Sequence, residues 1–161
     1  MFWSRRAITV TGLVALAAFL PGPAAQAGEV RYFHPCGSSD ISRVEIAGCD
    51  ESPCTFYKGD TYKLSVTFVP DRSSNDIALT GTARYFSIPM PLLGSQDSGS
   101  DIGLPSVTAG QAATFTKDIK VPDLYPFSSA TESWNLTADG SSLVCFDLPI
   151  QVRAKTILGD L

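Results

Sequence analysis

Apolar and polar side chains alternate over long parts of this chain, which is typical of β-strands with one face in a core and the other in water. In residues 62–68 and again in residues 144–152, every second residue is apolar. Weaker segments of the same kind are Val30–His34, Val44–Ile46, Ile77–Tyr85, Phe115–Val121 and Trp134–Ala138. The pattern predicts about seven strands, although a short helical turn fits Ile41 and Val44 equally well.

Polar turns separate the predicted strands. Residues 58–60, 70–76 and 139–141 are rich in Gly, Pro, Asn, Asp and Ser, which favour turns. Helical spacing long enough for a parallel crossover does not occur between them. The sequence therefore predicts an all-β protein, an immunoglobulin-like antiparallel β-sandwich.

Two apolar turns interrupt the alternation. Residues 86–93 are strongly apolar but contain Pro89 and Pro91, which remove ladder donors and restrict this segment to a loop or an edge strand. A polar stretch at 94–110 follows and is predicted to be a long loop. Tyr125-Pro126-Phe127 is the second apolar turn. The two turns either plug the ends of the core or form the lip of a hydrophobic pocket.

The first 27 residues have the features of a signal peptide. Arg5 and Arg6 precede an apolar run at 7–20, and Ala25-Gln26-Ala27 fits a cleavage site. A run of this length is too short to span a bilayer of about 30 Å. We therefore expect a signal peptide at 1–27 and one exported domain at 28–161. Removal of both arginines would change the net charge from −4 to −6.

Charge and composition narrow the classes of partner. With 44% apolar and 17% charged residues, the chain should form a packed domain rather than a disordered one. It has no basic block that could bind a phosphate backbone, so we expect no nucleic acid partner. We expect the domain to be a monomer.

Export changes the interpretation of the four cysteines, because an oxidising compartment favours disulfides. Four cysteines allow three pairings. A bridge between Cys49 and Cys54 is sterically simple if Pro53 folds the short loop back, and it leaves Cys36 with Cys145. A zinc site made of all four is the alternative, although paired CxxC motifs are missing.

The sequence contains no recognisable catalytic motif. Since His34 is the only histidine, any mechanism that needs a histidine base must use it, and a structural role for it is favoured. Metal-binding clusters and phosphate-binding glycine loops are also missing. We therefore expect neither an enzyme nor a bound metal or cofactor.

Several ordered motifs resemble one lipid-binding family. They are Cys36-Gly37-Ser38, Cys54-x-Phe56-x-Lys58-Gly59-x-x-Tyr62, Ile88-Pro89-Met90-Pro91, Tyr125-Pro126, Trp134-x-Leu136 and the segment from Cys145 to Val152. In this order they resemble the ML (MD-2-related lipid-recognition) family, most closely its Niemann-Pick type C2 branch, which includes the group 2 mite allergens.

The resemblance implies a sandwich whose sheets leave an apolar cavity for a sterol, fatty acid or other lipid. It implies the bridges Cys36–Cys145 and Cys49–Cys54. The implied lipid-binding residues are those of the two apolar turns and two aromatic side chains that face the interior: Phe86, Ile88, Pro89, Met90, Tyr125, Pro126, Trp134 and Phe146. A polar end of the lipid is expected at the cavity mouth, because burying it without a partner costs about 1–3 kcal/mol.

Three functional hypotheses follow. The first is a carrier that is secreted or resides in the endosomal or lysosomal lumen and transfers a sterol or related lipid to a membrane or a protein partner. The second is an innate-immunity protein that presents a microbial lipid to a receptor. The third is an interaction module with a filled core.

Asn135-Leu136-Thr137 is an N-glycosylation sequon, and Asn135 should point outward because its two neighbours point inward.

Overall fold

The computed structural model describes residues 27–126 and 128–155, so the predicted signal peptide lies outside the described residues except for Ala27. The described residues form ten strands: β1 (Ala27–Glu29), β2 (His34–Pro35), β3 (Asp40–Ala47), β4 (Cys54–Tyr57), β5 (Thr61–Val69), β6 (Ile77–Tyr85), β7 (Ile88–Ser98), β8 (Ala113–Lys120), β9 (Ser129–Ala138) and β10 (Ser141–Arg153).

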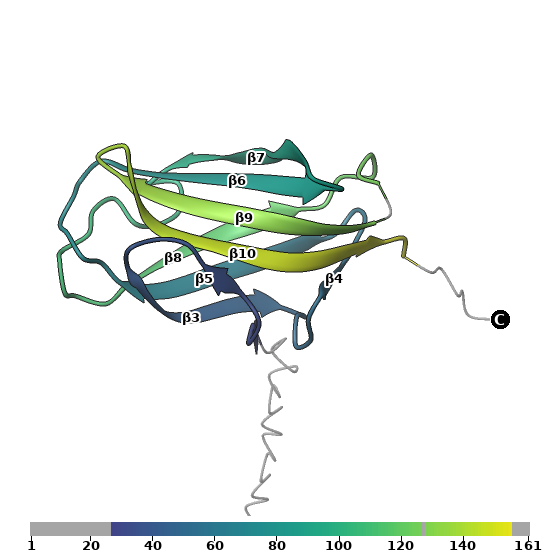
Figure 1. Cartoon of the computed structure of the whole chain (residues 1–161), viewed down its shortest axis with the longest axis horizontal. Coiled ribbons are helices and arrows are strands. Elements are labelled where there is room, and N and C mark those ends of the chain that lie inside the picture. Colours follow the sequence, from purple (N-terminus) through teal and green to yellow (C-terminus); the bar gives the residue numbers. More distant parts are fainter. Residues whose placement is uncertain (1–26, 127, 156–161) are drawn as a thin grey trace, which may run out of the picture.

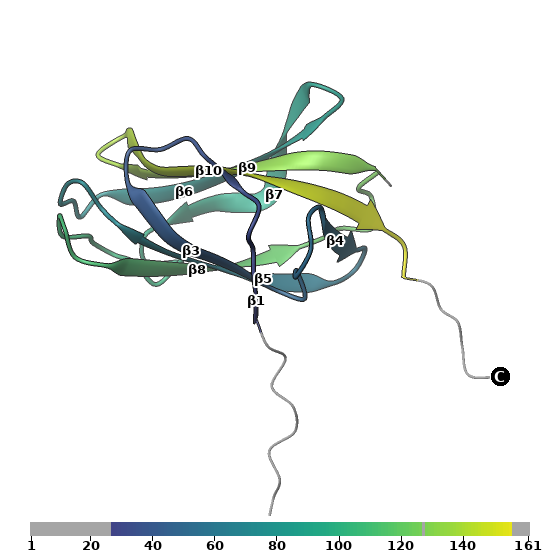
Figure 2. The ribbon, with the colours of Figure 1, turned by 60° about the horizontal axis from the view of Figure 1, so that its bottom comes forward.

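The strands make two sheets that pack face to face (Figures 1 and 2). The first sheet has the order β1-β3-β5-β8, and the second has the order β2-β10-β9-β6-β7, with β4 also paired to β10. Among the described residues, all strand pairings are antiparallel except that of β4 with β10. The predicted β-sandwich is confirmed, and the parallel β4 is an addition that the sequence pattern did not reveal.

The core lies between the sheets because alternate side chains of each strand point inward. In β9 every second residue from Ala130 to Ala138 is buried, while the residues between them are partly exposed. Large aromatic side chains fill much of the interior: Phe56, Phe68, Phe115, Trp134 and Phe146. The alternation seen in the sequence is therefore the alternation between core and solvent.

Two segments differ from the sequence prediction. The strand predicted at Val30–His34 is wrong, because the chain there passes from β1 in one sheet to β2 in the other. Only Val30 stays attached to the first sheet, through its backbone N–H to Val44 O at 2.8 Å. The segment at 94–110 is not loop throughout, since β7 continues to Ser98. As the two prolines required, β7 is an edge strand.

The region around Ile41 and Val44 belongs to β3 and not to a helical turn. A register shift between Ile41 and Arg43 interrupts its pairing with β5. This irregularity explains why the apolar spacing there departs from strict alternation.

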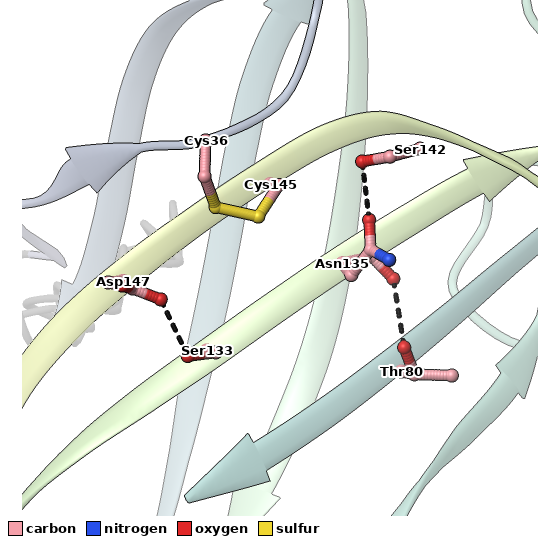
Figure 3. Close-up of a disulfide and its surroundings, with 7 residues drawn as sticks. All are labelled: Cys36, Thr80, Ser133, Asn135, Ser142, Cys145 and Asp147. Atoms are coloured by element: carbon pink, nitrogen blue, oxygen red, sulfur yellow. Dashed lines mark hydrogen bonds between the residues drawn. A yellow bond between two sulfur atoms is a disulfide. The ribbon is translucent and has the colours of Figure 1, made fainter. Parts of the chain in front are cut away.

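Both predicted disulfides are present. Cys36–Cys145 joins residues 109 positions apart and is called the long-range disulfide below, and Cys49–Cys54 is called the short-range disulfide (Figure 3 shows the former). They use all four cysteines of the chain. The alternative of a four-cysteine zinc site is therefore wrong.

Candidate functional site

A narrow crevice lies between the edge strands β7 and β8, where the two sheets face each other. It is lined by Leu92–Ser95 of β7, Lys117–Lys120 of β8, Tyr125 and Trp134. Its volume is about 10 Å³, which corresponds to a single water molecule. In this conformation the crevice gives no access for a larger molecule to the space between the sheets.

Two polar contacts hold the crevice closed. The backbone N–H of Leu93 donates a hydrogen bond to the Tyr125 hydroxyl at 3.1 Å. Lys117 Nζ of β8 lies 2.7 Å from Asp97 Oδ1 of β7, and both side chains are largely buried, with 16% and 14% exposure. Neither disulfide connects β7 to β8. The contact between these two edges is therefore non-covalent and partly polar.

A bulge in β7 shapes the rim of the crevice. The register with β6 shifts between Thr80 and Thr82, so that residues 92–95 leave the regular ladder opposite Gly81. The Ser95 hydroxyl lies 2.8 Å from the Gly81 carbonyl oxygen. A Cβ atom on Gly81 would come within 2.9 Å of the Trp134 ring, so the bulge and the indole fit only around a glycine.

The tip of the β6–β7 hairpin projects away from the two layers (Figure 2). Phe86 and Ser87 form its turn and both have positive φ, 47° and 72°. Such a turn usually contains Gly, Asn or Asp, because other side chains are strained there. Phe86 is 90% exposed, and Ile88 and Met90 are 64% and 40% exposed. The hairpin therefore presents apolar side chains to solvent on a preformed turn.

The structure separates the predicted lipid-binding residues into three places. Phe86, Ile88, Pro89 and Met90 are exposed on the hairpin, and Pro126 is exposed in the turn before β9. Tyr125 and Trp134 line the crevice. Phe146 is fully buried, and its ring lies edge-on to Phe33 with centroids 6.1 Å apart. These residues do not line one continuous cavity in this conformation.

Glu132 is a buried acid that the sequence reasoning missed. It lies on β9 with 2% exposure, between Ala83 of β6 and Leu148 of β10 in the neighbouring strands. Trp134 Nε1 donates a hydrogen bond to its Oε2 at 3.2 Å. Burial raises the pKa of Glu132 to about 7, and the bond from Trp134 opposes the rise. Alternation could have found it, because Glu132 is two residues from the inward-facing Trp134.

The hydroxyl of Tyr85 is a second polar group in the interior. Tyr85 is 6% exposed, and its oxygen is buried with no hydrogen-bond partner. Burial raises the pKa of Tyr85, and the charges of Glu132 and Tyr125 add to the rise. The last residue of β6 therefore brings an unpaired hydroxyl into the same electrostatic environment as Glu132.

The wider surface offers grooves but no metal centre in the part of the chain that the structure describes. A groove of about 420 Å³ runs beside the hairpin and includes Arg84, Phe86 and Ile150. His34 is exposed on β2. Within residues 27–126 and 128–155, no three His, Cys, Asp or Glu side chains gather to hold a metal ion. The same residues include no helix long and apolar enough to cross a membrane.

Asn135 lies on the outer face of β9, beside the long-range disulfide (Figure 3). Its Oδ1 accepts a hydrogen bond from Ser142 Oγ at 2.7 Å, and its backbone oxygen accepts one from Thr80 Oγ1 at 3.3 Å. The side chain is partly exposed. Its outward direction agrees with the alternation, while glycosylation of this residue stays a prediction.

The fold and the crevice define a two-sheet β-sandwich with a non-covalent contact between the edge strands β7 and β8. The sequence model of the ML domain matches residues 32–152. This chain therefore belongs to the ML domain family, and the resemblance inferred from its motifs is confirmed.

Known proteins of similar sequence cover most of the chain. NPC intracellular cholesterol transporter 2 of Mus musculus is 28% identical over 147 residues, which cover 88% of this chain and 98% of that protein. The mite group 2 allergen Lep d 2 of Lepidoglyphus destructor is 22% identical, over 86% of this chain and 97% of the allergen.

A solved structure supports the same fold. The crystal structure of a Niemann-Pick type C2 protein from the Japanese carpenter ant superposes with a TM-score of 0.65 at 18% sequence identity. The superposition covers 76% of this chain and 99% of the ant protein. Together with the family match, the comparisons support a lipid-binding protein of the ML type.

Proposed function

We propose that this protein is a non-catalytic lipid carrier of an exported compartment. It takes up a sterol or a related lipid between its sheets through the β7–β8 crevice and transfers it to a membrane or a protein partner. The observation that carries the proposal is the crevice itself, where Tyr125 and the core residue Trp134 meet the free edge of both sheets. The similarity to proteins named as cholesterol transporters supports a sterol as the cargo.

Uptake requires the sheets to separate at this edge. A pocket for a small ligand has about 300 Å³ or more, whereas the crevice has about 10 Å³. The contacts that must break are the hydrogen bond to Tyr125 and the Asp97–Lys117 ion pair. A hydrogen bond of this kind contributes on the order of 1 kcal/mol. Separation also exposes the buried side chains of Leu92, Ile119 and Tyr125 at this edge, so the lipid that enters must cover them in turn.

The exposed hairpin suits the transfer step. Phe86, Ile88 and Met90 are apolar and exposed, and the same strand leads from them into the rim of the crevice. A lipid leaving the crevice would therefore pass from the core to an apolar surface and not directly into water. Contact of this hairpin with a membrane or an acceptor protein would keep the lipid's apolar surface covered during transfer.

Export follows from the predicted signal peptide at 1–27. The proposed compartment is the extracellular space or the endosomal or lysosomal lumen, and the two disulfides are consistent with either.

Titration with the fluorescent sterol dehydroergosterol tests the proposal. The full chain should bind it, and Met90→Asp should abolish uptake while the far-UV circular dichroism and melting temperature stay unchanged, because Met90 is exposed. Tyr32→Asp is the matched control, since Tyr32 is also exposed but lies outside the hairpin. It should bind like the wild type.

Mass spectrometry of lipids extracted from the natively sourced protein identifies the cargo. A co-purifying sterol supports the carrier, and an acylated glycolipid would point instead to recognition of microbial lipids. A lipid-free protein that also ignores the fluorescent sterol would show that the sandwich is a filled interaction module.

A further inference from the structure

A trough crosses the outer face of the second sheet, on the side away from the first sheet. It consists of two depressions, of about 420 Å³ and 530 Å³, that share Pro149. The hairpin tip with Phe86 borders the first depression, and Figure 2 shows this tip rising above β9 and β10. The second depression lies against residues 31–34, which lead into β2. We call the two depressions together the outer trough.

The floor of the outer trough is a row of side chains from three neighbouring strands. Arg84 of β6 pairs with Thr131 of β9, and Thr131 pairs with Pro149 of β10. All three point outward, because the residues beside them in each strand are buried in the core. Two strand spacings separate Arg84 from Pro149, or about 10 Å. Among the described residues, the outer trough shares none with the crevice.

The outer trough carries positive charge although the chain as a whole is acidic. The chain has 16 Asp and Glu against 12 Lys and Arg. In the described part of the chain, no acidic side chain lines the outer trough, whereas Arg31 and Arg84 do. Both arginines are exposed, and neither side chain has an ion-pair or hydrogen-bond partner among the described residues. Two guanidinium groups are therefore available to bind an anion.

Acidic side chains near the outer trough set its direction. Asp147 lies on the same face of β10 as the floor, and its Oδ1 accepts a hydrogen bond from Ser133 Oγ at 2.6 Å. Residues 50–51 are both acidic and line a separate depression, which meets the first one at Pro53. Since like charges repel, an extended anion would run from the hairpin across Pro149 towards residues 31–34 and not towards residues 50–51.

We propose that the outer trough binds an acidic polysaccharide, whose chain lies across β6, β9 and β10. Guanidinium groups pair with anionic oxygens through two parallel hydrogen bonds, as Arg31 and Arg84 could do. Tyr32 and Phe86 present exposed rings, one in each depression, and the electron-rich faces of such rings attract the C–H groups of a sugar. The Thr131 hydroxyl can exchange hydrogen bonds with sugar hydroxyls. This site is independent of the lipid uptake proposed above.

Two other anionic partners suit the outer trough less well. An extended acidic peptide that adds to a sheet binds through its backbone, but the floor is a sheet face whose backbone groups already form the ladders between β6, β9 and β10. A flat bilayer would touch the projecting hairpin tip before it reached the floor beside Arg84. A polysaccharide combines anionic groups, hydroxyls and apolar ring faces in one narrow chain, so it matches every feature of the outer trough.

Fluorescence anisotropy of a fluorescein-labelled heparin octasaccharide, titrated with the full chain, tests the proposal. The wild type should bind it, and an unlabelled octamer of galacturonic acid should displace it, because carboxylates also fit the guanidinium groups. Maltooctaose, a neutral sugar of the same length, and polyglutamate of equal charge should displace it about tenfold less well. No binding of heparin, or equal displacement by polyglutamate or by phosphatidylserine vesicles, would overturn the proposal.

Variants of the exposed side chains assign the binding to the outer trough. The double variant Arg31→Ala and Arg84→Ala should bind heparin about tenfold more weakly, and Tyr32→Ser about threefold. The matched control is the double variant Arg43→Ala and Lys63→Ala, which removes the same charge from exposed positions on the first sheet. It should bind heparin like the wild type. An equal loss in both double variants would show general attraction between charges and no site.

Sterol binding gives an independent readout. Uptake of dehydroergosterol by the variant Arg31→Ala and Arg84→Ala should equal that of the wild type, because the outer trough and the crevice lie in different places on the sandwich. A parallel loss of sterol uptake would show that the outer trough is not a separate site. A wild type that binds heparin in the expected way but no sterol would support the outer trough and refute the proposed function.

Discussion

The buried carboxyl of Glu132 should make the stability of the fold fall as the pH rises from about 4.5 to about 7. Burial raises its pKa in the folded state from 4.5 to about 7. In this range the folded state binds more protons than the unfolded state, so each rise in pH favours unfolding. Below pH 4.5 both states are protonated and above pH 7 both are ionised, so the loss is confined to this window.

The size of the effect follows from the size of the shift. A pKa that rises from 4.5 to about 7, at about 1.4 kcal/mol per pKa unit, corresponds to about 3 kcal/mol of lost stability at pH 8. A typical domain of this size is stable by only about 5–15 kcal/mol. The effect is therefore large enough to measure.

Urea unfolding of the wild type and of Glu132→Gln, at several pH values from 4.5 to 8, isolates this contribution. Glutamine has nearly the same shape but does not titrate, so the other carboxyl groups cancel in the difference between the two proteins. Glu132→Gln should be nearly as stable as the wild type at pH 4.5 and about 3 kcal/mol more stable at pH 8. A stability difference that does not change with pH would refute the reasoning, since Glu132 would then have an ordinary pKa in the folded protein.

Three further predictions concern the contacts that shape the sandwich. Gly81→Ala should lower the free energy of unfolding by about 1–3 kcal/mol in urea titration, because a Cβ would lie within 2.9 Å of the Trp134 ring, and an unchanged midpoint would contradict this fit. Replacing both cysteines of the long-range disulfide by serine should cost about 5 kcal/mol, against about 2 kcal/mol for the short-range one, because the closed loops differ in length; equal losses would speak against the loop argument. The double variant Lys117→Gln and Asp97→Asn should speed uptake of dehydroergosterol in stopped-flow fluorescence, and an unchanged rate would show that the crevice is not the route of entry.

The strands with strict alternation could be predicted from the sequence, and the connections between sheets could not. Residues 77–85 were predicted with the bounds that β6 has, because inward and outward positions differ clearly in polarity there. The segment 30–34 looks like a strand because Val30 and Phe33 are apolar, but these side chains pack against the core while the backbone changes sheets. The pattern of apolar residues predicts which side chains are buried. It does not predict which segments form the hydrogen bonds of a sheet.

The sequence identified several residues of the candidate site but not where they lie relative to one another. The apolar side chains of residues 86–90 were identified, yet only the tertiary structure shows that they are exposed on a hairpin while Tyr125 is buried beside the crevice. The pairing of the cysteines was predictable since a short loop favours its own closure. The interior position of Glu132 was missed, although alternation with Trp134 indicates it, because acidic residues are rarely buried.

The turn at the tip of the hairpin lowers the stability of the fold but exposes an aromatic ring. Left-handed backbone at Phe86 and Ser87 costs of order 1 kcal/mol or more for each residue, and Asn-Gly would adopt it with less strain. An exposed phenyl ring adds no core packing in return. Engineering this turn for thermal tolerance would therefore remove a ring that is 90% exposed. Under the proposed function, the more stable protein is expected to transfer lipid more slowly.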